Sequence, residues 1–268
     1  MTGAPAGDGA RRRLEAVVFD VDGTLVDSER HGHRVAFNLA FEELGLSYRW
    51  DEYEYGRLLR VTGGRRRIEG YLADQGVEEA ERAELAARLH ERKTAIMKDL
   101  IAQGRVRARP GATRLLGELA GAGCRLAVAT TGSRGWVGSV LERCVPGVRF
   151  DVVVAGDEVA ARKPDPEAFV RAVELLGVGP AGVVAVEDSA EGLESAVGAG
   201  LRTAVVVNGY TADHDVTAAD LVLDGFGQPG APAAVLADRR GTGCGGILDR
   251  ATLERLVDPP RHADRDPE

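Results

Sequence analysis

The chain has 268 residues, of which 44% are apolar and 28% charged, and these ordinary proportions exclude a largely disordered protein. Its 42 acidic residues outnumber its 34 basic ones, and the net charge of −8 argues against a general affinity for nucleic acid. No apolar run is long enough for a membrane span or a signal peptide, and three widely spaced cysteines support neither a disulfide framework nor a four-thiolate zinc site. We therefore expect a cytoplasmic protein without nucleic-acid or membrane partners, and we expect it to be a monomer.

Short apolar runs rich in valine recur along the chain and alternate with segments of helical length. Such near-continuous runs are typical of parallel strands that helices cover on both faces, and ligands bind such sheets outside the carboxyl ends of the strands. The predicted strands are 14–19, 124–130, 150–155, 183–186 and 203–207, with a weaker one at 220–223. The predicted helices between them are 110–122, 135–143, 166–176 and 192–199.

Composition also divides the chain into domains. The first 13 residues offer little to bury and are expected to be disordered, whereas residues 30–105 show helical spacing without a convincing strand. The tail begins with the linker-like sequence GQPGAPAA and contains one predicted helix at 248–257, and we assign it no function. The predicted organisation is an N-terminal segment (1–13), a core domain (14–29 with 106–226), an inserted helical cap domain (30–105) and a C-terminal extension (227–268).

Two carboxylates, Asp20 and Asp22, directly follow the first predicted strand in the sequence FDVDGT. Like charges this close are unfavourable unless a cation or a shared proton compensates them. One alternative is a capped strand end with a turn at Gly23. A calcium loop is a weaker alternative, because His31 occupies the twelfth position, where an EF-hand needs glutamate.

Three further polar groups follow later predicted strands: Thr130, Lys163, and the pair Glu187 and Asp188. Each alone is better explained as a helix cap, a surface lysine or an acidic turn. Together they lie at the carboxyl edge of one parallel sheet, where they supply a nucleophile, a site for a hard cation and positive charge for phosphate oxygens. This combination predicts phosphoryl transfer.

The ordered segments DVDGT, AVATT, RKPDP and VEDSAEG resemble the motifs of the haloacid dehalogenase (HAD) superfamily, and the resemblance covers residues 14 to about 226. It implies an α/β fold, a Rossmann-like parallel sheet core with an inserted α-helical C1 cap. It also implies that Asp20 is the nucleophile, which forms an aspartyl-phosphate, and that Asp22 is the general acid and base. Thr130 and Lys163 would hold the phosphoryl oxygens.

The same resemblance implies an Mg²⁺ site formed by Asp20, the backbone carbonyl of Asp22, Glu187 and Asp188. Mg²⁺ suits an all-oxygen site that keeps several waters and a substrate phosphate. Because an ordinary carboxyl group, with a pKa near ~4, donates a proton poorly at neutral pH, we expect burial to raise the pKa of Asp22.

Specificity is expected to come from the cap, where the segments WDEYEY and TGGRRR offer glycines for close approach and guanidinium groups for a second phosphate. A basic helix start on the cap surface is the alternative. With AFN at 36–38 and NGYT at 208–211, these elements resemble the CbbY branch, which is similar to β-phosphoglucomutase and dephosphorylates xylulose 1,5-bisphosphate. This chain departs from that pattern by one extra residue before His33 and by its Arg65 and Arg66. The expected substrate-binding residues are Glu29, His33, Tyr55, Gly63, Gly64, Arg65, Arg67 and Thr131.

The resemblance thus implies an Mg²⁺-dependent phosphatase of a small phosphorylated sugar. Two alternatives share all its core residues: a β-phosphoglucomutase-like mutase, and a phosphatase of another small phosphorylated metabolite such as phosphoglycolate. A binding module without activity is disfavoured, because Asp20, Asp22, Lys163 and Asp188 are all present.

Overall fold

The computed structural model describes residues 13–61 and 63–258, so the predicted disorder of the first residues lies almost wholly outside the described part. The chain divides into two compact units. Over the described residues, the sheet unit comprises 13–20, 110–131 and 148–258, and the helical unit comprises 21–109 and 132–147. The helical unit thus takes in segments on both sides of the predicted cap, and the predicted domain boundaries stay a prediction.

The sheet unit contains a seven-stranded sheet in the order β3-β2-β1-β4-β5-β6-β7, in which β1 to β6 are parallel and β7 is antiparallel to β6. Phe19, the last residue of β1, lies opposite Val128 of β2 and Val186 of β4, so the residues that follow these strands emerge at one edge. The strands are β1 (Ala16–Phe19), β2 (Arg125–Ala129), β3 (Val152–Val154), β4 (Val183–Glu187), β5 (Arg202–Val206), β6 (Leu221–Leu223) and β7 (Val235–Asp238).

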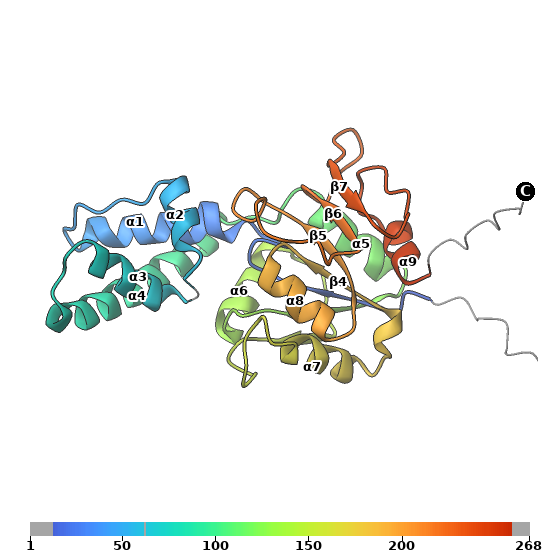
Figure 1. Cartoon of the computed structure of the whole chain (residues 1–268), viewed down its shortest axis with the longest axis horizontal. Helices are drawn as coiled ribbons and strands as arrows, with labels where there is room; N and C mark the ends of the chain where they lie inside the picture. The colour runs from blue at the N-terminus through green and yellow to red at the C-terminus, as the bar shows by residue number, and fades with distance from the viewer. Residues whose placement is uncertain (1–12, 62, 259–268) are drawn as a thin grey trace, which may run out of the picture. The chain divides into compact units, whose positions relative to one another are not determined.

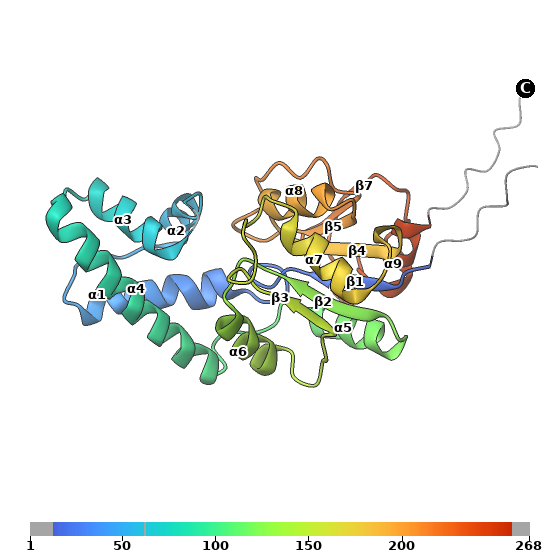
Figure 2. The same cartoon turned by 90° about the horizontal axis from the view of Figure 1, so that it is seen from below.

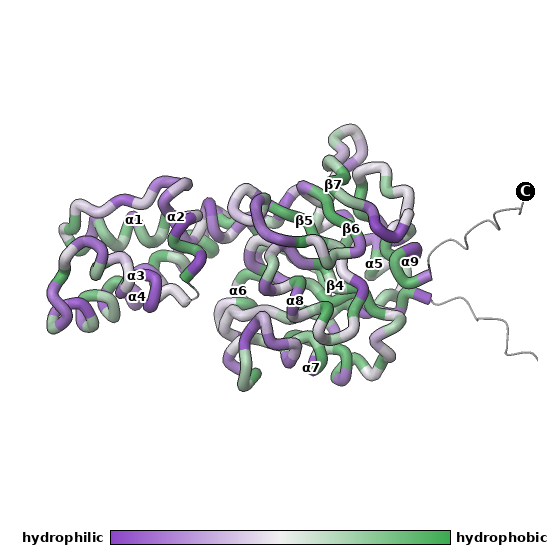
Figure 3. Tube along the Cα trace, in the orientation of Figure 1, coloured by the Kyte–Doolittle hydropathy of each residue, from purple (hydrophilic) through white to green (hydrophobic). Residues whose placement is uncertain are grey.

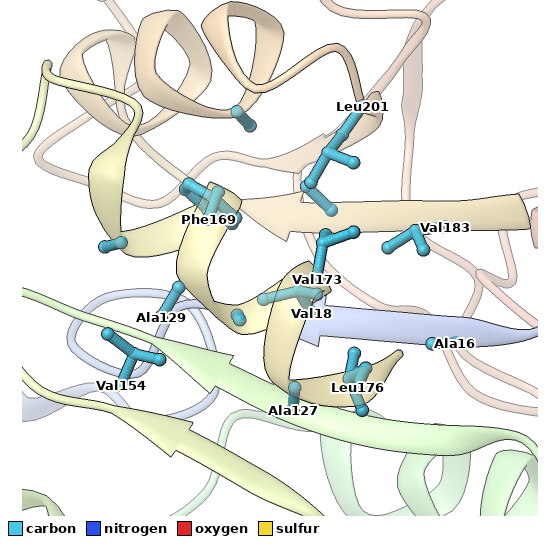
Figure 4. Close-up of a cluster of buried hydrophobic side chains, with 14 residues drawn as sticks. Ala16, Val18, Ala127, Ala129, Val154, Phe169, Val173, Leu176, Val183 and Leu201 are labelled. Carbon is cyan, nitrogen blue, oxygen red and sulfur yellow. The ribbon is translucent and has the colours of Figure 1, made fainter. Parts of the chain in front are cut away.

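Helices cover both faces of this sheet (Figures 1 and 2). On one face, α7 (Glu167–Leu176) packs on β1, β2 and β3 while α8 (Ala190–Gly198) packs on β4 and β5. On the other face lie α5 (Ala112–Gly121) and α9 (Arg250–Val257), and a short 3₁₀ turn (Pro180–Gly182) precedes β4. Figure 4 shows Phe169, Val173 and Leu176 of α7 in one buried cluster with Val18 of β1 and Ala127 of β2. Alternate residues of a strand point to the same face, so these strand residues face the helix.

The helical unit is built around one long helix, α4 (Glu79–Ala102), which contacts α1, α3 and α6. A π-helical turn (Glu29–His33) runs directly into α1 (Arg34–Glu43). A π turn holds one more residue than an α turn, as the predicted extra residue before His33 would require. The remaining helices are α2 (Glu52–Leu58), α3 (Gly64–Asp74) and α6 (Arg134–Cys144).

An aromatic cluster forms the core of the helical unit. The ring of Trp50 lies 4.7 Å from that of Phe37 and 5.0 Å from that of Phe41, and all three side chains are fully buried. The amide of Asn38 donates to the Trp50 carbonyl and accepts from its N–H, both at 2.8 Å. The AFN and WD elements, which carry part of the resemblance, therefore contact each other in the core of this unit.

The tail differs from its linker-like composition. Beyond residue 226 the chain adds β7 to the sheet and α9 to one face, at the place where a helix is predicted. One guanidinium nitrogen of Arg114 donates to three carbonyls, those of Phe226, Gly227 and Leu248, at 2.8–3.4 Å. Glycine and proline in this part of the sheet unit form tight turns, as at Pro229 and Gly230. Composition alone does not distinguish such turns from a linker.

Hydropathy follows the sheet: Figure 3 colours its strands predominantly as hydrophobic. Every predicted strand and core helix is found, with ends displaced by a few residues at most. Within the described ranges, none of the helices combines the length and the apolar composition needed to cross a membrane.

Candidate active site

Lys163 joins two carboxylates at the carboxyl edge of the sheet. Its ammonium group lies 2.7 Å from Oδ1 of Asp20, which directly follows β1, and 2.5 Å from Oε1 of Glu187, the last residue of β4. The Lys163 side chain is only 6% exposed. Burial lowers the pKa of Lys163, but the two carboxylates outweigh burial and raise the pKa well above that of an ordinary lysine. Lys163 therefore carries a fixed positive charge beside Asp20.

Asp20, Glu187 and Asp188 form a buried acidic cluster, in which one carboxylate oxygen from each lies within 4.8 Å of the others. Oε2 of Glu187 accepts from the backbone N–H groups of Asp188 (2.9 Å) and Ser189 (3.3 Å), so both of its oxygens have protein donors. A Cβ atom at Gly192 would lie 1.9 Å from this carboxyl group, so only glycine fits there. The start of α8 thus holds Glu187 rigidly.

Asp188 is oriented by a residue from the loop after β5. Nδ2 of Asn208 donates to Oδ2 of Asp188 at 2.7 Å. Asn208 is itself fixed, because its side-chain oxygen accepts from the N–H of Tyr210 (2.8 Å) and its own N–H donates to the Thr211 hydroxyl (3.0 Å). The NGYT element thus positions an acidic side chain of the cluster.

Thr130 and Thr131 follow β2 at the same edge. The N–H of Thr130 donates to the Val154 carbonyl (3.1 Å), and the residue is almost fully buried. The backbone of Thr131 packs against Gly156, where a Cβ atom would lie 2.2 Å from the Thr131 carbonyl oxygen. The structure therefore brings Thr130 to the edge that carries Asp20, while its contact with a substrate stays a prediction.

The loop that carries Lys163 is tied down at several points. The carboxylate of Glu167 accepts from the N–H groups of Ala160 (2.9 Å) and Ala161 (2.8 Å). The Ser195 hydroxyl of α8 donates to the Asp165 carbonyl at 2.6 Å. These bonds explain how a long loop holds a lysine at a defined position.

Asp22 belongs to the helical unit, where three side chains surround its carboxylate. The Ser28 hydroxyl donates to Oδ1 (2.5 Å), Nε2 of His33 lies 3.8 Å from Oδ1, and the indole N–H of Trp136 donates to Oδ2 (3.1 Å). Burial raises the pKa of Asp22, but His33, Ser28 and Trp136 together lower it below its ordinary value. The expected rise of this pKa is therefore wrong for this structure, because sequence alone did not reveal the donors around the carboxylate.

The turn after Asp22 is also fixed from within the helical unit. Gly23 has a positive φ of 86°, which favours glycine, and its N–H donates to the Val26 carbonyl at 2.8 Å. The buried guanidinium group of Arg109 donates to the Gly23 carbonyl at 2.7 Å. The turn at Gly23, which the alternative of a capped strand end predicts, thus follows the two carboxylates Asp20 and Asp22.

Four of the predicted substrate-binding residues lie in a partly buried polar network. The Tyr55 hydroxyl donates to Glu29, and Arg67 donates to the Tyr55 hydroxyl (3.4 Å) and to the Leu58 carbonyl (3.1 Å). His33 meets the ammonium group of Lys93, whose Nζ lies 2.8 Å from Nδ1. Arg67 is only 8% exposed, and its guanidinium group already forms hydrogen bonds within the helical unit.

The other predicted cap residues lie around the start of α3. Gly63 has a φ of 94°, and a Cβ atom on Gly64 would lie 3.2 Å from the His90 ring. Arg65 is exposed and forms a surface ion pair with Glu69 at 2.9 Å. The structure thus separates the arginines: Arg67 is buried, whereas Arg65 is accessible to a ligand.

A family model described as haloacid dehalogenase-like hydrolase matches residues 14–200. The chain belongs to this family. Protein CbbY from Cereibacter sphaeroides is 42% identical over 225 residues, which cover 83% of this chain and 96% of that protein. A CBBY-like protein of Arabidopsis thaliana is 40% identical over 222 residues, which cover 80% of this chain and 70% of that one.

Solved structures agree with this family assignment. The structure of a CbbY mutant from Rhodobacter sphaeroides in complex with xylulose-(1,5)bisphosphate matches with a TM-score of 0.69 at 42% identity, and covers 79% of this chain and 94% of that one. The predicted superfamily, its CbbY branch, the fold class and the enzyme class, a HAD phosphatase, are confirmed. The individual site residues stay predictions.

Sequence reasoning missed three side chains that this HAD enzyme places in its polar networks: Ser28, Lys93 and Trp136. The burial of Lys93 could have been predicted from the sequence. Lys93 lies four residues after Leu89 and four before Met97, on the apolar face of α4. A lysine on such a face needs a buried partner. Ser28 and Trp136 carry no comparable pattern.

Proposed function

We propose that this HAD enzyme is an Mg²⁺-dependent phosphatase of phosphorylated sugars that acts through an aspartyl-phosphate on Asp20, with xylulose 1,5-bisphosphate as its substrate. The observation that supports this most strongly is the pairing of Asp20 with Lys163 inside the buried acidic cluster. A carboxylate beside a fixed positive charge at a strand end can approach a phosphate that is itself an anion.

In the first step, a carboxylate oxygen of Asp20 forms a bond to phosphorus, and the bond from phosphorus to the sugar oxygen breaks. Lys163 and Thr130 bind the equatorial phosphoryl oxygens, where negative charge is spread in the transition state. Asp22, two residues along the chain, gives its proton to the departing sugar oxygen.

In the second step, water attacks the phosphorus of the aspartyl-phosphate while Asp22 takes one of its protons. Inorganic phosphate leaves, and Asp20 returns to its carboxylate form. The three side chains around Asp22 lower its pKa and so favour the anionic form that accepts this proton. The proton taken from water here is the one that Asp22 gives to the sugar oxygen in the next turnover.

The residues present fit an Mg²⁺ ion, because the donors of the buried cluster are carboxylate oxygens. Asp20 and Asp188 would hold it with the backbone carbonyl of Asp22. Glu187, whose oxygens already accept three hydrogen bonds and pair with Lys163, would support them. When bound, Mg²⁺ supplies positive charge that reduces the repulsion between Asp20 and the phosphate.

The substrate assignment rests on the similarity to CbbY, whose structure holds xylulose-(1,5)bisphosphate, and on the accessible Arg65 beside Gly63 and Gly64. A guanidinium group at a glycine-rich helix start suits a second phosphate, which hydrolysis of a monophosphate would not need. Glu29, His33 and Tyr55 would then face the sugar hydroxyls.

The test is inorganic phosphate release, with Mg²⁺, from xylulose 1,5-bisphosphate, ribulose 1,5-bisphosphate, phosphoglycolate and β-glucose 1-phosphate. We expect kcat/KM for xylulose 1,5-bisphosphate to exceed that for each of the others at least about tenfold. Against the two monophosphates, one charge-assisted contact to the second phosphate contributes about that much. Ribulose 1,5-bisphosphate has the same second phosphate and differs in the configuration of one hydroxyl, so discrimination against it would come from the contacts to the sugar hydroxyls. A flat profile would reject the substrate. Isomerisation of β-glucose 1-phosphate without net phosphate release would instead identify a mutase.

A further inference from the structure

Trp136 is the described side chain that donates to Oδ2 of Asp22. The other two groups around this carboxylate, Ser28 and His33, both approach Oδ1. The indole N–H of Trp136 donates to Oδ2 at 3.1 Å. Donors on two different oxygens fix the rotation of a carboxylate about its Cβ–Cγ bond, which donors on one oxygen do not.

The position of Trp136 is built into the helical unit. Its ring lies 5.0 Å from that of His33, at an angle of 35°. A Cβ atom at Gly132 would lie 2.7 Å from Cδ1 of the indole, so the absence of a side chain there makes room for the ring. Helix α6, which carries Trp136, is anchored by Arg143, whose guanidinium group donates to the Ala102 carbonyl at 2.5 Å.

An indole N–H is a donor only, and it does not ionise near neutral pH. Trp136 therefore cannot replace Asp22 as an acid or a base; it can only orient it. General acid catalysis requires the carboxyl group within hydrogen-bond reach of the departing oxygen, so its orientation affects the rate.

We propose that Trp136 is a positioning residue for Asp22, one that holds the carboxyl group in the orientation needed to give its proton to the leaving group. This inference rests on the proposed role of Asp22 in the proposed function. It extends the site to α6, a helix that none of the predicted motifs includes.

The test compares two substrates that differ in their need for a proton. Xylulose 1,5-bisphosphate releases a sugar alkoxide that must be protonated, whereas p-nitrophenyl phosphate releases a stable phenolate. For Trp136→Phe, which keeps a ring beside His33 but loses the N–H, we expect kcat/KM to fall about tenfold for the sugar phosphate and less than about twofold for the aryl phosphate. An equal loss for both, or no loss, would overturn the proposal.

A second pair of variants tests the same contact without changing the tryptophan. Gly132→Ala displaces the indole, so it should reproduce the substrate-dependent loss, whereas Gly135→Ala, where a Cβ atom meets nothing within 4 Å, should behave as the wild type. If Gly132→Ala leaves the ratio of the two substrates unchanged, the indole does not position Asp22.

Fluorescence gives a readout that does not depend on turnover, because Trp50 and Trp136 are the two tryptophans of the chain. The substitution Asp22→Asn should change the tryptophan emission when it is made in the wild type, and should leave the emission unchanged when it is made in the Trp136→Phe variant. Equal changes in both backgrounds would contradict the contact between Trp136 and Asp22.

The Asp22→Asn variant also separates the proposed role of Trp136 from the proposed role of Asp22. If it fails to produce the substrate-dependent loss, the proposed role of Asp22 is wrong, whereas if it succeeds and Trp136→Phe does not, only the role of Trp136 is wrong.

Discussion

The two units of this HAD enzyme position polar side chains in different ways. In the sheet unit, Asp20, Lys163 and Glu187 come from strand ends or the loops that follow them, and the parallel register brings them to one edge. In the helical unit, Lys93 and His33 meet through helix packing, although they are 60 residues apart in the sequence. We expect the sheet unit to supply the nucleophile and the metal-binding carboxylates, and the helical unit to supply Asp22 and to distinguish between substrates.

The largest effect should come from the sheet unit. Asp20→Asn removes the nucleophile, so phosphate release should fall at least about a thousandfold for every substrate, as expected for loss of a group that forms the covalent intermediate. Circular dichroism should show an unchanged fold. The matched control Asp213→Asn, on an exposed side chain of the same unit, should keep full activity. If Asp20→Asn retains a tenth of wild-type activity, the aspartyl-phosphate mechanism is wrong.

The second prediction concerns selectivity in the helical unit. Arg65→Ala should raise KM for the bisphosphate about tenfold, with little change in kcat or Tm, because Arg65 is exposed and free to bind a second phosphate beyond its surface pair with Glu69. Arg67→Ala serves as the comparison and should lower stability by about 1–3 kcal/mol, because a buried guanidinium group is lost from the Leu58 carbonyl.

Steady-state kinetics on the bisphosphate and on p-nitrophenyl phosphate would check this assignment. An Arg65→Ala variant that loses the same factor on both substrates would show that Arg65 does not recognise a second phosphate. The division of roles between the two units would then no longer hold for this residue.

The third prediction uses the same substitution in each unit. Asn208→Ala removes a donor from Asp188, so the Mg²⁺ concentration for half-maximal activity should rise about tenfold, as is usual when a residue that orients a metal ligand is lost. Asn38→Ala should instead lower Tm without changing the Mg²⁺ requirement, because its amide holds the backbone of Trp50. Titration of activity against Mg²⁺ would decide, and equal requirements in both variants would contradict the role of Asn208.

The last prediction concerns the pH dependence of stability and leaves activity aside. Burial lowers the pKa of Lys93 from 10.5 to about 8, with Glu29 and Asp22 raising it and Arg67 lowering it. The folded protein then binds fewer protons than the unfolded chain between about pH 8 and 10.5, so the stability of the wild type relative to Lys93→Met should rise across this range, by at most about 3 kcal/mol. Urea unfolding at pH 7.5, 9 and 10 would measure this difference, and a constant difference would show that Lys93 is not buried as described.

The sequence predicts the polar residues of the sheet unit better than those of the helical unit. Strand ends are predictable because a valine-rich run that stops at a polar residue indicates both the strand and its edge, as at Asp20 and Glu187. The partners of Asp22 were not predictable, since Ser28 and Trp136 reach it through a loop and a helix whose packing leaves no periodic signal. The lowered pKa of Asp22 follows from those partners, which is why the sequence suggested the opposite direction.

The segment beyond residue 226 has a practical consequence for anyone who shortens the chain. The family match ends at residue 200, yet β7 covers β6 at the end of the sheet, and Arg114 binds the segment in three places. A protein trimmed at residue 226 would expose the backbone of β6 as an open edge and uncover the face beneath α9. Open edges pair with other chains, so we expect such a fragment to aggregate rather than to purify as an active enzyme.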